Sequence, residues 1–509
     1  MADESAQDIV VGARVNARAK ALIILLVLIV PLVALAIWIS ISDVEFIDTI
    51  ADYLPVLMFA NLGILLFSGY PVAFILGGLA FSYGMIGYFL GVFSLIEFFN
   101  FLPRIWGQAA ENLVLVAVPT FVFMGVMMER SGVAHGMLYC CQVLLRRVPG
   151  ALALAVTVMG TILAAITGII GASVTMMTAL ALPTMLRQKY SQELATGCIA
   201  ASGTLGILIP PSIMLIIMAD LLAVSVGTVF MTALGPGLIL ATFYLIYIAT
   251  AARINPKMAP PLPRDQLYVP RRELPGLILK GFLPPTFLIL LIKGSILFGF
   301  ATPSEAGAVG AFGAVVLAAA NRKLKWNLVK SVNYASALTI GMIFFIVMSA
   351  TCFAYVFRSL GGDDIVEGLI LAAGLGPWGL LLLIMAVIFV LGFFLDWIEI
   401  TLIVLPVFGP LVVGLDFGDH LPGWLGPNEM MFWFIVLMAL NLQTSFLTPP
   451  FGYAIFYLKG IAPEEVKIES IYRGIIPFVV LQLLAVIAVL AFPKLALYLP
   501  YVVYGPAAG

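Results

Sequence analysis

Apolar segments of helix length recur along almost the whole chain and constrain its fold more than any other feature. A transmembrane helix needs about 20 mostly apolar residues, and such runs begin near residue 21 and continue to residue 493. Only 10% of the residues are charged, against about 25% in a soluble domain. Lipid admits only helices or closed barrels, and barrel strands would alternate in polarity. The continuous runs therefore predict an all-α polytopic membrane protein and exclude a soluble enzyme.

The net charge and the positions of the cysteines and histidines exclude several kinds of binding site. The formal net charge is −1, so no bulk positive field would attract a nucleic acid. The four cysteines lie in apolar stretches without metal or redox spacing, and the two histidines, His135 and His420, are far apart. We therefore expect no catalytic residues, no transition-metal site and no nucleic-acid partner.

The Lys and Arg residues predict the topology. Most of them fall on one side, the cytoplasmic side, if segments 150–186 and 377–413 are re-entrant hairpins that return to the side they entered from. This arrangement places the N-terminus in the cytoplasm and the C-terminus in the periplasm. The first run, 21–41, has no small-residue cleavage site after it, so we expect a retained anchor and not a signal peptide.

Three landmarks recur in the same order and indicate an internal repeat. A Pro turn separates two spans at Pro71 and at Pro303, a Leu-Pro pair closes each hairpin, and a double proline interrupts a long apolar segment at 210–211 and at 449–450. Each unit contains five crossings and one hairpin, so the second unit is expected to be inverted. Paired interrupted helices of this kind are typical of secondary transporters.

The predicted organisation follows from these landmarks. An N-terminal tail with the anchor covers 1–52, and a cytoplasmic amphipathic connector covers 253–282. The first repeat covers 53–252, with its broken helix at 195–219, and the second covers 283–493, with its broken helix at 429–458. Residues 494–509 are expected to form a periplasmic tail.

The first break, Ala201–Ser212, combines two glycines with two prolines. Proline removes a backbone donor and clashes with the preceding turn, so carbonyl groups are freed inside the membrane. Such carbonyls suit a small hard cation, supplemented by the hydroxyls of Ser202, Thr204 and Ser212. The alternative interpretation is a simple proline kink in a packed helix.

The second break, Asn441–Pro450, is richer in polar groups, which cannot all face lipid. Hydrogen bonding between helices is the alternative to a binding role. The neighbouring hairpin tip contains Asp396, an intramembrane carboxylate that is functional by default. Asp396 is expected either to carry a coupling proton or to complete a cation site, and it also has the type and position of a helix N-cap. Glu399, three residues on, is in capping-box position.

Two further charges lie in or beside apolar runs. Glu305 follows Thr302 and Pro303 at a helix start, where a capping role and a ligand role are both open. Lys293 lies within an apolar run. It either extends to the headgroups or serves as the counter-charge for an anionic substrate.

Several sequence blocks resemble the large membrane subunit of tripartite ATP-independent periplasmic (TRAP) transporters. The blocks keep the family's order across about 53–500, and they are 147–150, 165–173, 203–212, 301–306 and 447–452. The resemblance implies an elevator-type transporter of the bacterial inner membrane that takes up an organic acid, usually a carboxylate, with sodium. It also implies a small four-helix membrane subunit and a periplasmic substrate-binding protein as partners.

The resemblance further implies sodium sites where each hairpin tip meets a broken helix. Carried over to this sequence, these sites comprise Gly168, Gly171, Ser173, Ser202, Thr204 and Gly206 in the first repeat, and Gly392, Asp396, Gln443, Thr444 and Thr448 in the second. We expect the substrate to contact Ser212, Asn441, Ser445 and Lys293. Trp397 and Glu399 depart from the small or apolar residues usual after the second tip.

Two other function classes are alternatives to a TRAP transporter subunit. A membrane-embedded aspartyl protease needs two carboxylates that share a site, and no second intramembrane aspartate accompanies Asp396 from another span. A single-component anion carrier or antiporter of the same architecture differs only in needing no binding protein. Proton coupling in place of sodium coupling also stays open from sequence alone.

Overall fold

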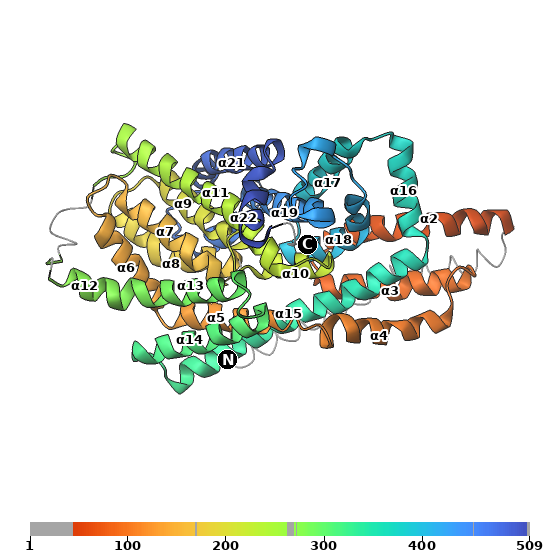
Figure 1. Ribbon diagram of the computed structural model, residues 1–509, viewed down its shortest axis with the longest axis horizontal. Coiled ribbons are helices and arrows are strands. Elements are labelled where there is room, and N and C mark those ends of the chain that lie inside the picture. Colours follow the sequence, from red (N-terminus) through yellow and green to blue (C-terminus); the bar gives the residue numbers. More distant parts are fainter. Residues whose placement is uncertain (1–43, 168–169, 262–268, 271, 451, 506–509) are drawn as a thin grey trace, which may run out of the picture. The chain divides into compact units, whose positions relative to one another are not determined.

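The computed structural model describes residues 44–167, 170–261, 269–270, 272–450 and 452–505, and the regular structure within these ranges is helical (Figure 1). The all-α prediction is thus confirmed for the described part of the chain. The predicted anchor 21–41, the predicted tip residue Gly168 and part of the predicted connector 253–282 lie outside the described residues.

Eight helices in the described part are long and apolar enough to cross a bilayer. Their burial differs strongly: 28% of the apolar stretch at Pro303–Ala320 is buried inside the protein, against 94% of the stretch at Gly426–Leu447. Large apolar side chains such as Phe312 on the first of these are exposed on the protein surface. Extended apolar surfaces of this kind suit contact with lipid chains, whereas the buried helix is surrounded by protein.

The chain divides into two compact units, the first of which comprises the described residues up to Trp106 together with Ser349–Leu369. Its helices are α2 (Val44–Leu66), α3 (Val72–Phe89), η1 (Leu95–Asn100), α4 (Phe101–Ile105), the end of α15 (Trp326–Ser359) and most of α16 (Gly362–Ala373). Asn61 on α2 donates a hydrogen bond to the Tyr83 hydroxyl on α3 at 2.6 Å. The turn between these helices contains Gly69 with φ +75°, as expected for the first Pro turn.

The second unit, Gly107–Met348 and Ile370–Gly509, contains both hairpins and both interrupted helices. After the turn η2 (Trp106–Ala110), its first half runs through α5 (Ala117–Arg130), α6 (Val133–Leu145), α7 (Ala151–Thr167), α8 (Ile170–Arg187), α9 (Gln192–Thr204), η3 (Leu205–Ile207), α10 (Ile213–Leu221) and α11 (Val226–Ile254). The first hairpin is therefore α7 with α8, and the first interrupted helix is α9 with α10.

The second half repeats this order of elements. It runs through α12 (Leu274–Leu277), η4 (Ile278–Phe282), α13 (Leu283–Leu297), α14 (Pro303–Ala320), most of α15, α17 (Pro377–Leu391), α18 (Trp397–Val413), η5 (Gly418–His420), η6 (Gly426–Asn428), α19 (Glu429–Leu447), α20 (Tyr453–Ile461), α21 (Ile468–Ala491) and α22 (Lys494–Tyr504). Helices α17 and α18 form the second hairpin, and α19 with α20 forms the second interrupted helix. The described structure thus contains two helical hairpins and two interrupted helices. That the hairpins re-enter the membrane and that the two halves are oppositely oriented stay predictions.

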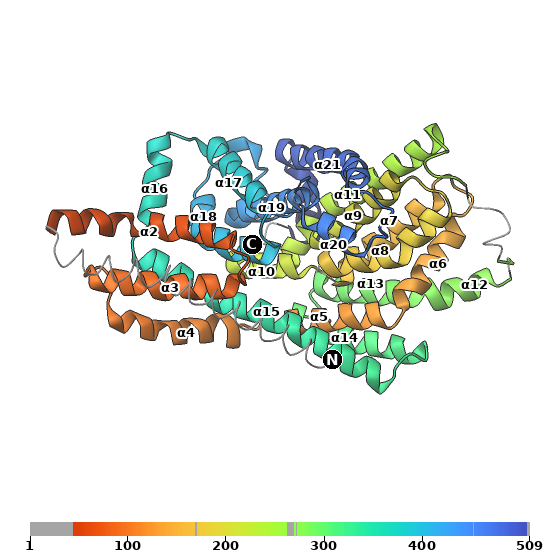
Figure 2. The same cartoon turned by 180° about the vertical axis from the view of Figure 1, so that it is seen from behind.

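Equivalent helices of the two halves make equivalent contacts. Helix α10 packs on α18 of the second hairpin, and α20 packs on α8 of the first hairpin. Helix α9 likewise packs on α21, and α19 packs on α11. In both views α19 lies between α17 and α11 (Figures 1 and 2). The interrupted helix of each half therefore packs against the hairpin of the other half.

Two boundaries differ from the predicted organisation. Residues 274–282 are helical and continue directly into α13, so this candidate span begins at Leu274 and the expected connector is shorter. Residues 494–504 form α22, which packs on α11 with Ala496 and Leu497 buried, where a tail was expected. The apolar face of α22 explains why residues 494–504 are helical, because packing of such a face stabilises a helix of this short length.

Candidate functional site

The first hairpin lies directly against the end of α9. A Cβ atom built on Gly203 would lie 3.2 Å from the Cα of Val174 on α8, so the two backbones approach closely there. Ser202 on α9 donates a hydrogen bond of 3.2 Å to the hydroxyl of Thr157 on α7. Ser173 on α8 is buried. The predicted residues Ser173, Ser202 and Thr204 therefore occupy adjoining buried helices.

The first break lies where its prolines predict. Helix α9 ends at Thr204, a 3-10 turn follows at Leu205–Ile207, and α10 begins only at Ile213. The Pro210–Pro211 peptide bond is cis. Ser212, the N-cap residue of α10, turns its hydroxyl back to donate a hydrogen bond of 2.8 Å to the carbonyl of Ile207. This break is entirely buried, and Gly206 lies in its 3-10 turn.

The second hairpin tip is shaped by a capping box. Asp396 is the N-cap of α18, and its carboxylate accepts a hydrogen bond of 2.7 Å from the backbone N–H of Trp397. The backbone N–H of Asp396 donates in turn to Glu399 at 3.2 Å. The same arrangement joins Thr302 to Glu305 at the start of α14. The capping roles predicted for Asp396, Glu399 and Glu305 are therefore confirmed, and they leave a ligand role for Asp396 open.

The second break begins later than predicted. Helix α19 is continuous through Leu447, and only Thr448–Gly452 separates it from α20. Thr444, Ser445 and Thr448 donate hydrogen bonds to carbonyl groups within α19 at 2.7–3.0 Å, and Asn441 donates to the carbonyl of Met385 on α17 at 2.6 Å. Polar side chains alone did not unwind the helix, because nearby carbonyls accept their hydrogen bonds.

Gln443 connects the two breaks. Its amide nitrogen donates a 3.4 Å hydrogen bond to the hydroxyl of Thr204 at the end of α9. Tyr244 of α11 lies beside both Gln443 and Gln482 of α21, and all three side chains are fully buried. The Tyr244 hydroxyl faces both amides, but it, the Gln443 carbonyl oxygen and both amide atoms of Gln482 make no hydrogen bond of standard geometry in the described structure.

This polar cluster was missed by the sequence analysis. A buried polar atom without a partner costs about 1–3 kcal/mol, so four such atoms in one place require an explanation. The signal available in the sequence was Gln482 itself, a polar residue inside the apolar run 470–493. Its partners could not be inferred, because Tyr244 and Gln443 come from helices far away in the chain.

Helix α20 contacts both hairpin tips through two tyrosines. The Tyr453 hydroxyl donates a hydrogen bond of 3.0 Å to the carbonyl of Phe394 in the second tip. A Cβ atom on Gly171, at the start of α8, would lie 2.8 Å from the ring of Tyr457. Both tyrosines are also close enough to Asp396 and Glu399 to interact with them electrostatically. These tyrosines were not predicted, although their spacing of four residues places them on one helical face.

Lys293 lies on a helix that contacts α7, one arm of the first hairpin. It is a residue of α13, which packs on α14, α11 and α7. Both interpretations of Lys293, as a counter-charge and as a residue that extends to the headgroups, therefore stay predictions.

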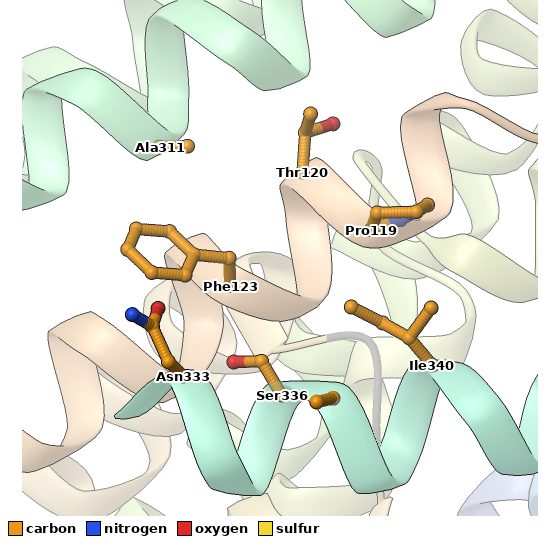
Figure 3. Close-up of a pocket in the computed structure, with 8 residues that line it drawn as sticks. Pro119, Thr120, Phe123, Ala311, Asn333, Ser336 and Ile340 are labelled. Atoms are coloured by element: carbon orange, nitrogen blue, oxygen red, sulfur yellow. The ribbon is translucent and has the colours of Figure 1, made fainter. Parts of the chain in front are cut away.

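One cavity in the second unit is lined by α5, α14 and α15, and not by the hairpins or the interrupted helices. It has a volume of about 430 Å³, and Figure 3 shows Phe123 of α5 near Asn333 and Ser336 of α15, whereas Thr120 of α5 points away from α15, on the side of Ala311 of α14. The buried hydroxyl of Ser336 has no hydrogen-bond partner there. None of the predicted binding residues lines this cavity.

The paired hairpins and breaks agree with a comparison to known families. Residues 59–495 match the DctM component of tripartite ATP-independent periplasmic transporters. The chain belongs to the DctM family. The predicted resemblance is confirmed, and the chain is a large permease subunit of a TRAP transporter.

Individual relatives agree with this DctM assignment. The C4-dicarboxylate TRAP transporter large permease protein DctM of Pseudomonas aeruginosa is 29% identical over 398 residues, covering 77% of this chain and 87% of that protein. The ectoine TRAP transporter large permease protein TeaC of Halomonas elongata is 28% identical over 391 residues, covering 76% and 86%. These DctM-family relatives are transport proteins and not enzymes.

A solved structure shares the fold. The YdaH transporter of Alcanivorax borkumensis, described as having an unusual topology, aligns with a TM-score of 0.55 at 13% sequence identity, covering 80% of this chain and 89% of that one. At this identity the likeness concerns the architecture alone. It supports a multi-pass transporter fold for this DctM-family chain.

Proposed function

We propose that this permease performs secondary active uptake of an organic acid, coupled to sodium, across the bacterial inner membrane. The observation that carries the proposal is the meeting of two interrupted helices at the Thr204–Gln443 hydrogen bond, each beside a hairpin tip. Relatives are named for C4-dicarboxylates and for ectoine. A dicarboxylate or a related carboxylate is the substrate that we propose.

Helix ends at the breaks supply the chemistry for cations. Helices α9 and α19 both end there, and the C-terminal end of a helix bears partial negative charge. Thr204, Gln443, Tyr244 and Gln482 together present oxygen atoms, several of them without a partner, and hard cations bind oxygen ligands. Asp396 forms no ion pair with a basic side chain among the described residues. Its carboxylate is therefore available to a cation.

The opposite helix ends suit the anionic substrate. Helices α10 and α20 begin at the breaks, and the N-terminal end of a helix favours an anion. Ser212 is the N-cap of α10, whereas Asn441 and Ser445 lie on α19 just before the second break. Bound cations would neutralise Asp396 and allow the tips to close on a carboxylate, which couples the two fluxes thermodynamically.

Transport in this proposal follows an elevator mechanism, in which one rigid body carries the site past another. The small membrane subunit and a periplasmic binding protein complete the tripartite transporter, and the binding protein delivers the substrate. The N-terminus lies in the cytoplasm and the C-terminus in the periplasm.

Replacing Asp396 with asparagine tests the proposal directly. Asparagine caps a helix as well as aspartate does, so the start of α18 should be retained while the charge is lost. We expect sodium-driven uptake in proteoliposomes to fall by about tenfold to a hundredfold, because a hydrogen bond or ligand contact with a charged group contributes roughly 1.5–3 kcal/mol. The assay uses the complete tripartite system and a panel of organic acids, with sodium added or withheld.

Glu305→Gln is the matched control. It removes a carboxylate from the capping box at the start of α14, which packs mainly on α5 and α13. Uptake by this control should equal that of the parent. If the sodium dependence of uptake were unchanged in Asp396→Asn, Asp396 would act only as a helix cap. If the parent took up substrate without the binding protein, a single-component carrier would be favoured.

A further inference from the structure

A second, larger cavity is lined by none of the residues of the breaks or the hairpins. It has a volume of about 1120 Å³ and is bounded by the start of α6, the continuous run from α12 to α13, and the end of α14. These elements lie at one end of the second unit in both views (Figures 1 and 2). One candidate span, Leu274–Leu297, begins at the cavity, and another, Pro303–Ala320, ends there. The cavity therefore lies where spans meet the edge of the bilayer.

Basic side chains dominate the charge of this cavity. Lys280, Arg322 and Lys323 line it, and Glu273 is the single carboxylate among its lining residues. No ion pair joins any of the three basic residues to a carboxylate within the ranges that the structure describes. Their charge is therefore available to an anion from outside the protein.

The start of α6 adds to this positive potential. Gly132 is its N-cap residue, with φ +75°, and no side chain caps the helix. The hydroxyl of the preceding residue, Ser131, donates to the carbonyl of Met128 in the helix before. Ser131, Gly132 and Val133 all line the cavity. The free N–H groups of a helix start attract anions, phosphate in particular.

An apolar stripe leads from the cavity along the same helical run. Leu279 lines the cavity, and Leu283 and Phe287 follow at intervals of four residues, on one helical face. These three side chains are all largely exposed. A cavity with basic side chains is thus continuous with a surface that suits acyl chains.

We infer that this cavity binds the phosphate headgroup of an anionic phospholipid, with the acyl chains along Leu279, Leu283 and Phe287. Basic pockets between transmembrane helices at the membrane edge have the chemistry that anionic headgroups require. The volume and the adjoining apolar stripe favour a lipid over a soluble phosphate, which would use only the basic residues. This site is separate from the transport site proposed above.

The test measures lipid retention by the full-length permease. The protein is purified in detergent with phosphatidylglycerol, phosphatidylcholine or inorganic phosphate, and bound lipid is counted by native mass spectrometry alongside thermal stability. We expect phosphatidylglycerol to be retained and to raise the melting temperature, and the other two to do neither. The triple variant Lys280→Gln, Arg322→Asn, Lys323→Gln should retain phosphatidylglycerol roughly a hundredfold more weakly, at about 1 kcal/mol per basic residue. Asparagine suits position 322, where φ is +54°.

Two controls keep the inference falsifiable. A triple variant outside the cavity removes the same amount of charge: Arg253→Gln, Lys257→Gln, Lys330→Gln. A double variant keeps the charge within the cavity: Lys280→Arg, Lys323→Arg. Both should retain phosphatidylglycerol as the parent does. Equal retention of phosphatidylcholine, equal stabilisation by inorganic phosphate, or an equal loss in the outside triple variant would overturn the assignment.

Discussion

Replacing Gly197 with valine is expected to prevent the permease from folding. Gly197 on α9 lies against the backbone of α21: its Cβ atom would lie 2.7 Å from the carbonyl carbon of Gly474 and closer still to the oxygen. A backbone carbonyl cannot rotate away as a flexible side chain can. Overpacking costs about 1–3 kcal/mol and more where nothing can move. The yield of monodisperse protein in detergent and its melting temperature measure the effect.

Glycines on both α9 and α21 lie against the backbone of the other helix, so the same contact can be tested from either side. A Cβ atom on Gly474 would lie 2.9 Å from the Cα of Glu193, and Gly474→Val should fail as Gly197→Val does. Gly341→Val is the control, because a Cβ atom on Gly341 in α15 meets nothing within 4 Å. If Gly197→Val were as stable as Gly341→Val, the close approach of α9 and α21 would be wrong.

Replacing Gly392 with alanine is expected to reduce uptake without preventing insertion. Gly392 begins the second hairpin tip, and its Cβ atom would lie 2.7 Å from that of Ser445 on α19 and would overlap the Ser445 hydroxyl. The tip must then move away from the second break, where we propose that a cation binds. An overpacking cost of roughly 1–3 kcal/mol corresponds to about a fivefold to hundredfold lower initial rate of uptake, if closure of the tip limits transport.

The same hairpin provides the control for Gly392→Ala. Gly376 precedes the other end of α17, has φ −70° and offers open space to a Cβ atom, so Gly376→Ala should transport normally. Removing the opposing side chain should relieve the overlap, and the double variant Gly392→Ala, Ser445→Gly is expected to recover part of the uptake. Additive losses in the double variant would show that the two residues do not meet.

The architecture was largely predictable because its signals are local. The hairpin predicted at 377–413 appears as α17 and α18, which begin at Pro377 and end at Val413. The double prolines at 210–211 and 449–450 both lie in the interruptions of the long helices. Proline acts on its own turn of helix through its missing N–H and its ring, so its effect can be inferred without knowledge of the fold.

The second break was predicted to begin at Asn441, but the helix continues to Leu447. The reason lies in hydrogen bonds within the helix itself. Thr444 and Ser445 resemble loop residues in sequence, yet their hydroxyls donate to carbonyls of their own helix. A hydroxyl that finds an acceptor one turn back leaves the helix intact. The helix ends where Thr448 meets the two prolines, and Gly452 then lies against the carbonyl groups of the preceding turn.

The sequence by itself determined that the chain crosses the membrane repeatedly and where its helices are interrupted, because span length, proline and glycine act within a few residues. Only the tertiary structure decided which polar groups meet. Gln443 contacts Thr204 across 239 positions of sequence, and Tyr457 contacts Gly171 from the other repeat. Such pairs depend on how separate helices pack, and in an apolar surrounding each polar group depends on the partner that packing provides.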